Sequence, residues 1–136
     1  MSATNYLELG LLDHLLGGPD FTRPANVYFA LFTAAPGESG GGTEASGGNY
    51  ARVALTNNNT NFAAATAPSG VGTKLNATMI AFQQATGAWG TVTHFGIFDA
   101  SSGGNLLIYG TLTTARAVVT GDTPRFLANA FSLTAD

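Results

Sequence analysis

Residues 91–113 read TVTHFGIFDASSGGNLLIYGTLT. The stretch contains two runs rich in β-branched and aromatic residues, 91–99 and 105–113, and this composition is typical of β-strands. The five residues between them are small or polar and end in Gly103 and Gly104. Glycine supplies the positive backbone φ that hairpin loops of this length need. We therefore expect an antiparallel hairpin here, and the hairpin indicates the fold class.

Further strand candidates lie on both sides of this hairpin. They are residues 26–33, 50–56, 75–83, 115–120 and 126–133. Residues 26–33 (NVYFALFT) place apolar side chains on both faces, as in a strand that is covered on both sides. Strands and helices do not alternate, so a parallel α/β fold is not expected. About seven short strands separated by turns predict an all-β protein, an antiparallel β-sandwich of jelly-roll type. We expect one domain, residues 1–136, with the sandwich at about 25–134.

One short helix is expected before the strands, at about residues 5–16. Asn5 is the expected N-cap, and Glu8 follows at the spacing of a capping box. Gly17 and Gly18 are expected to end the helix. A helix of about three turns is marginal alone, so it must dock on its own core or on another protein. The residues that would dock form an apolar stripe at helical spacing: Leu7, Leu11, Leu12, Leu15 and Leu16.

The chain carries unusually little charge. Charged residues make up 10% of its 136 residues, and only five are Lys or Arg, which is too few for a nucleic-acid surface. The absence of cysteine excludes a disulfide framework and a thiolate metal site. No apolar run approaches the ~20 residues of a membrane-spanning helix. A surface of low charge loses little hydration free energy when another protein covers it, which favours protein binding as the function. Two long loops, 34–49 and 57–73, add surface for such contacts.

The sequence shows no pattern of catalytic or metal-binding residues. His14 and His94 are the only possible histidine bases, and neither belongs to a Ser-His-Asp pattern or a G-x-S-x-G turn. Metal-ligand spacings are absent, so we expect no metal and no cofactor. An alternative is sugar binding by stacking on aromatic residues, although in all-β proteins these residues more often belong to the core. The aromatic candidates are Tyr28, Tyr50, Trp89 and Tyr109.

Five segments carry a resemblance to a known family. They are TNYLELGLLDHLLGG (4–18), PANVYFALFTAAPGE (24–38), GGNYAR (47–52), WGTVTHFGIFDASSGGNLLIYGTLT (89–113) and GDTPRF (121–126). Together they resemble small virion structural proteins of tailed bacteriophages. This group includes tail-fibre-like proteins and capsid cement, or decoration, proteins, and the chain most resembles the cement protein of a short-tailed Bordetella phage. The resemblance implies a β-rich, oligomeric fold without catalytic residues.

We accordingly expect a non-enzymatic cement protein that binds the outer surface of the major capsid protein shell. It would be assembled into the virion in the cytoplasm of the host bacterium. Its expected partners are the major capsid protein and further copies of itself, preferably as a dimer, without nucleic acid or membrane. Leu12, Leu16 and Tyr50 are the expected interface residues. The alternatives are a trimeric tail-fibre or baseplate component that contacts host glycans, and a soluble sugar-binding or hydrolytic β-sandwich.

Overall fold

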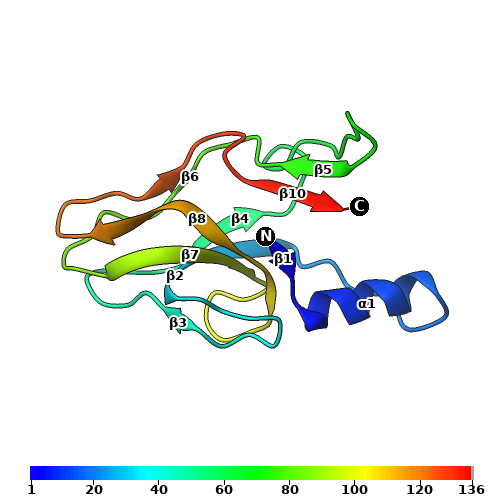
Figure 1. Ribbon diagram of the computed structural model, residues 1–136, viewed down its shortest axis with the longest axis horizontal. Helices are drawn as coiled ribbons and strands as arrows, with labels where there is room; N and C mark the ends of the chain where they lie inside the picture. Colours follow the sequence, from blue (N-terminus) through cyan, green and yellow to red (C-terminus); the bar gives the residue numbers. More distant parts are fainter. Residues whose placement is uncertain (136) are drawn as a thin grey trace.

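The computed structural model describes residues 1–135, which form an antiparallel β-sandwich with one short helix, α1 (Asn5–Leu15) (Figure 1). The large sheet has the order β1-β8-β7-β2-β3, and β4 also pairs with β2. Its strands are β1 (Ser2–Ala3), β2 (Asn26–Ala34), β3 (Thr43–Glu44), β4 (Val53–Thr56), β7 (Gly90–Phe98) and β8 (Leu106–Val118). The second layer consists of two ribbons, β5 (Gly72–Leu75) with β10 (Ser132–Ala135), and β6 (Ile80–Ala81) with β9 (Arg125–Phe126). The prediction of an all-β sandwich is confirmed.

The predicted hairpin forms the centre of the large sheet. Strands β7 and β8 pair antiparallel, with Phe95 opposite Gly110. Gly103 and Gly104, in the loop between them, have φ values of 58° and 72°. Both values lie in the left-handed region, which glycine adopts without a steric penalty. The two glycines therefore close the hairpin as the sequence predicts.

Aromatic side chains join the two layers. Phe29 on β2 and Phe95 on β7 point toward the ribbons, where they meet Phe126 and Phe131. The ring centroids of Phe29 and Phe131 are 5.6 Å apart, and those of Phe95 and Phe131 are 5.7 Å apart, both edge to face. Such pairs contribute roughly 0.5–1.5 kcal/mol beyond the burial of their surface. The core of the protein is therefore the space between the sheet and the ribbons.

The opposite face of β2 is also covered, which confirms the interpretation of residues 26–33. Phe32 is 2% exposed and stacks on Phe98 with centroids 6.1 Å apart. Gly96 on β7 makes room for this packing. A Cβ atom added there would lie 2.7 Å from Leu106 Cδ1 and 2.8 Å from Phe32 Cε2, both closer than van der Waals contact allows. Any larger residue would displace the side chains that cover this face.

The strand predicted at residues 75–83 is interrupted by a buried side chain. Asn76 is fully buried, and its Nδ2 donates hydrogen bonds to the carbonyl oxygens of Thr78 and Leu127. Its Oδ1 accepts a hydrogen bond from the backbone N–H of Phe131. The bonds to Leu127 and Phe131 join two distant chain segments, and the bond to Thr78 is local. Because they replace regular strand pairing, β5 ends before Asn76 and β6 begins after it.

Other strand boundaries also differ from the predictions. The strand predicted at 50–56 is shortened to β4, and the one at 126–133 is divided between β9 and β10. The segments 105–113 and 115–120 form one continuous strand, β8, because β7 supplies pairing partners along both parts. The two-residue strands β1 and β3 were not predicted, since so short a run carries no periodic signal.

Helix α1 is capped by Thr4, and not by Asn5 as predicted. The Thr4 hydroxyl accepts a hydrogen bond from the backbone N–H of Leu7 and donates toward the carbonyl oxygens of Leu106 and Leu107 on β8. Asn5 has no such contact with the sheet and is the first residue of the helix. The contact with β8 therefore selects Thr4 between two adjacent residues that both suit a cap.

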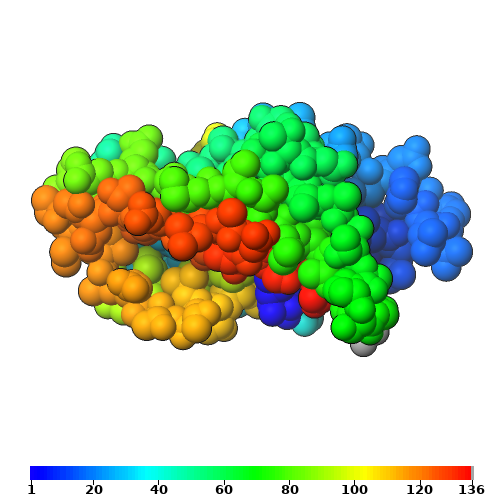
Figure 2. All heavy atoms as spheres, turned by 90° about the horizontal axis from the view of Figure 1, so that it is seen from above, coloured from blue at the N-terminus to red at the C-terminus, as the bar shows by residue number. Residues whose placement is uncertain are grey.

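The helix forms one end of the molecule (Figures 1 and 2). It leaves β1 at the edge of the large sheet and extends away from the sandwich. No helix in residues 1–135 has the length and hydropathy needed to cross a membrane.

Candidate functional site

Leucine side chains gather on the surface of α1 that faces solvent. They are 48–80% exposed, and the helix has no buried residue. We call this surface the leucine face, and it consists of Leu9, Leu11, Leu12, Leu15 and Leu16. A fully exposed leucine side chain offers roughly 100 Å² of apolar surface, and these five are 48–80% exposed. The leucine face therefore offers roughly 300 Å² of apolar surface to the solvent. Of the two alternatives for this stripe, packing on the protein's own core applies to Leu7 alone, and the remaining leucines of the stripe are exposed.

Helical geometry explains why one leucine points inward and the others outward. Positions three and four residues apart share a side of a helix. Leu11 and Leu15 therefore continue the row that begins at Leu7 and carry it from the core out to the tip of the helix. Glu8 is exposed and lies on the same side as Leu11 and Leu12. Asp13 is also exposed and lies on the same side as Leu9 and Leu16, so two carboxylates border this apolar surface.

The chain that follows α1 packs against the other side of the helix. Phe21 lies over Gly10, where an added Cβ atom would come within 2.6 Å of the Phe21 ring. The rings of Tyr6 and Phe21 meet edge to face, 6.2 Å apart. The backbone N–H of Phe21 donates to His14 Nδ1 at 3.3 Å. The protein's own chain thus packs on the side of the helix that carries Tyr6, Gly10 and His14, and leaves the leucine face free.

An apolar groove of about 210 Å³ begins at the base of the helix. Leu7 and Phe21 form its wall on the helix side, and Phe62 and Leu133 are among the residues on the side of the sandwich. Arg23 and Lys74 are also among its lining residues. Within residues 1–135, neither of these two cations lies within ion-pair distance of a carboxylate. We call this feature the apolar groove.

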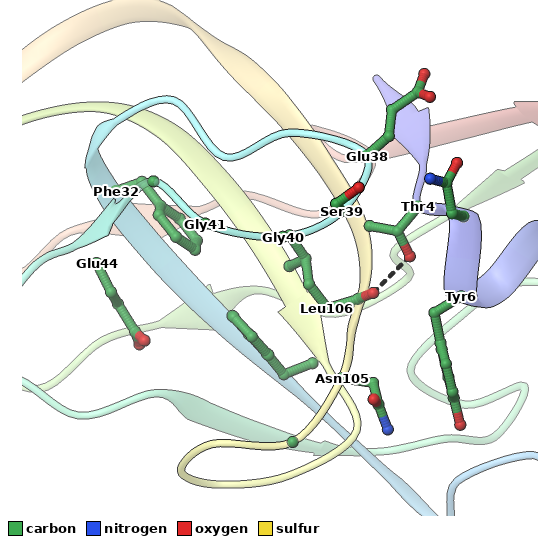
Figure 3. Close-up of a pocket in the computed structure, with 14 residues that line it drawn as sticks. Thr4, Tyr6, Phe32, Glu38, Ser39, Gly40, Gly41, Glu44, Asn105 and Leu106 are labelled. Carbon is green, nitrogen blue, oxygen red and sulfur yellow. Dashed lines mark hydrogen bonds between the residues drawn. The ribbon is translucent and has the colours of Figure 1, made fainter.

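A larger and more polar hollow of about 620 Å³ lies beside the N-terminus of α1 (Figure 3). The glycine-rich loop at 38–42 forms one wall, and the hairpin loop at Gly104 and Asn105 contributes to another. Tyr6 and Glu38 line it from the helix and from the loop. Backbone and uncharged groups make up most of this lining.

Arg52 connects β3 to the hairpin loop between β7 and β8. Its guanidinium forms a two-point ion pair with Glu44, with N–O distances of 2.8 and 2.9 Å. It also donates hydrogen bonds to the carbonyl oxygens of Ala100 and Gly103, both at 2.8 Å. The guanidinium carbon lies 3.5 Å from the centroid of the Phe98 ring, in cation–π geometry. These contacts occupy the side chain fully, so its role is to hold the fold.

The structure separates the three predicted interface residues. Leu12 and Leu16 belong to the leucine face, and their role in an interface stays a prediction. Tyr50 lies elsewhere and is half-buried, and its hydroxyl accepts from the Leu31 N–H and donates to Glu44 Oε1. Burial raises the pKa of the Tyr50 phenol, while the hydrogen bond from Leu31 opposes this shift. The geometry gives Tyr50 an internal, structural position.

Trp89 and the two histidines, which the sequence also offered as candidate residues, contact groups of the same chain. Trp89 is 3% exposed, and its Nε1 donates to the carbonyl oxygen of Gly48, so it offers no ring surface for stacking on a sugar. His94 Nδ1 lies 2.8 Å from Thr93 Oγ1, and His14 Nδ1 lies 3.3 Å from Asp20 Oδ1. In the part of the chain that the structure describes, no three His, Asp or Glu side chains gather as a metal site would require.

Comparison with known proteins decides the family. The model of the family described as podophage GP4 fiber I protein gp80 matches residues 2–134. The chain belongs to the gp80 family. A search of curated proteins found no match. The chain is therefore a structural protein of a phage virion, and the predicted resemblance to virion structural proteins of tailed phages is confirmed at that level.

Sequence reasoning missed the apolar groove and its two cations. Lys74 and Leu133 meet because β5 pairs with β10, a contact between distant segments. Arg23 reaches the same place because the chain folds back after α1. No local pattern in the sequence signals either event, whereas the leucines of α1 are adjacent in sequence and were found.

Proposed function

We propose that this protein is a non-catalytic structural subunit of a podophage fibre, and that it attaches to other protein subunits through α1. The observation that carries the proposal is the leucine face. Five exposed leucines that are concentrated on one helix, and not scattered singly over the surface, indicate a protein–protein contact. Placing five leucines in water is unfavourable unless the assembled particle covers them.

The fibre role is supported by the family description, which names a fiber protein. The cement role predicted from the sequence is the second candidate, and the low surface charge supports it. Five basic and eight acidic residues in 136 leave little charge to desolvate when the protein lies across a capsid shell. Both roles require the protein to be held in the virion by contacts with other subunits, and they differ in copy number.

Quantitative mass spectrometry of purified virions tests this choice. Peptides of this chain are measured against peptides of the portal protein and of the major capsid protein. A fibre subunit is expected at a copy number close to that of the portal and far below that of the capsid protein. A copy number in the hundreds, comparable to the capsid protein, would overturn the fibre role and support the cement role. Absence from virions would overturn both roles.

A further inference from the structure

We infer that the leucine face of one copy binds the apolar groove of a second copy, so that two chains form a two-fold dimer. The inference deepens the proposed function, on which it rests, by naming a partner for α1. Three features carry it: the continuity of the two surfaces, the area they offer and the charges that they place opposite each other.

The leucine face and the apolar groove form one continuous surface. Leu7 belongs to the groove wall and is the first member of the row that Leu11 and Leu15 extend. Exposure rises along this row, from half-buried Leu7 to 48% at Leu11 and 73% at Leu15. In a two-fold interface the same patch on each subunit contacts its copy. An axis that passes between the helix and the groove places each helix against the other copy's groove.

The area of the surface fits a pair of copies. One side of a standard interface covers about 800 Å², of which roughly 60% is apolar. The leucine face alone, at roughly 300 Å², is smaller than this apolar share. The adjoining groove adds apolar surface, including that of half-buried Leu133. A partner that engages both features therefore buries more apolar surface than the leucine face alone provides.

The charges of the two features are complementary. Two carboxylates on α1, Glu8 and Asp13, lie beside the leucines, and Arg23 and Lys74 line the groove. The chain contains only five basic residues, so two of them at one apolar groove is a marked concentration. Within residues 1–135, the Lys74 Nζ donates a hydrogen bond to the neutral side chain of Asn59, at 3.2 Å, and forms no ion pair. The groove therefore fits an apolar helix that also carries carboxylates, and α1 of a second copy is such a helix.

Sedimentation equilibrium of the purified full chain tests the inference. We expect a mass of twice the 13.9 kDa chain. Replacing Leu12 by Glu should raise the dissociation constant of the dimer about 30-fold or more, as the loss of a central interface residue does. Leu127→Glu is the matched control, because Leu127 is also 59% exposed but lies outside both features. A monomeric wild-type chain, or equal effects of the two substitutions, would overturn the inference.

Charge reversal tests the pairing of the groove with Glu8. Lys74→Glu should weaken the dimer, and combining it with Glu8→Lys in the same chain should restore at least part of the affinity. Arg125→Glu is the control, since Arg125 lies on β9, outside the groove. A double variant that binds no better than either single variant would contradict the proposed contact.

Engineered cysteines test whether the contact joins different copies. The chain contains no cysteine, so Glu8→Cys and Lys74→Cys chains each carry one thiol. A mixture of the two should form a disulfide-linked dimer under mild oxidation, more rapidly than either chain alone. No acceleration in the mixture would overturn the inference. Because these measurements use the purified chain, their failure leaves the copy number in virions, and hence the proposed function, untouched.

Discussion

Replacing Thr4 by Val should destabilise the protein and loosen α1, because Thr4 joins the helix to the sheet. The residue is 2% exposed, and its hydroxyl both caps α1 and donates to carbonyl oxygens on β8. Valine has the same shape but no hydroxyl. Loss of the cap costs about 0.5 kcal/mol, the low end of the usual range, because the bond from the Leu7 N–H is long, at 3.5 Å. The Leu106 carbonyl, deprived of its hydroxyl donor in a buried site, adds about 1.5 kcal/mol.

The expected loss is therefore about 2 kcal/mol in the free energy of unfolding, or about 8 °C in Tm for a chain of this length. Urea denaturation followed by the fluorescence of Trp89 measures it, since this single tryptophan is 3% exposed and becomes solvated on unfolding. Thr111→Val is the control, because Thr111 is exposed on β8. Hydrogen exchange should accelerate in α1 more than in β7. Equal stability of the two variants, within about 0.5 kcal/mol, would refute this account of Thr4.

Three further predictions concern residues inside the fold. Arg52→Met should cost about 2–3 kcal/mol in unfolding free energy and increase hydrogen exchange in residues 100–104, because it leaves the Glu44 carboxylate unpaired and removes two bonds to the hairpin loop. Asn76→Leu keeps the volume but deprives the buried Phe131 N–H and two partly buried carbonyl groups of their partner; we expect a loss of about 3 kcal/mol, and a loss under about 1 kcal/mol in urea titration would contradict this. Burial raises the folded-state pKa of Tyr50 above its unfolded value of about 10, so the stability that this residue contributes is present below pH ~10 and lost above it. Tyr50→Phe should therefore make the fall of Tm with rising alkaline pH less steep. An unchanged dependence of Tm on pH would contradict the raised folded-state pKa of Tyr50.

The sequence predicted the elements whose signals are local. The hairpin at 91–113 and the helix near Asn5 were found because period-two and period-3.6 patterns depend on neighbouring residues. The strand at 75–83 was wrong because Asn76 bonds to Leu127 and Phe131, which are distant in sequence. The same limit applies to Thr4, whose selection as the cap depends on β8.

The candidate site was predicted in part for the same reason. The leucines of α1 are visible as a stripe, but the stripe does not reveal whether it faces inward or outward. That direction is set by Phe21, which packs on the opposite side of the helix at Gly10. Arg23 and Lys74 line the same groove because the tertiary fold brings their segments to one place. No spacing of residues in the sequence predicts that arrangement.

The most direct test of the central claim is the incorporation of variant chains into virions. Phage that encode Leu12→Glu and phage that encode the equally exposed Leu127→Glu are grown and purified, and the chain is quantified in each particle by mass spectrometry. If the leucine face holds the protein in its assembly, the Leu12→Glu chain should be depleted about tenfold or more, as expected for a loss of about 1.4 kcal/mol or more. The Leu127→Glu chain should remain at the wild-type level. Wild-type levels of both chains would contradict the claim that this subunit binds through α1.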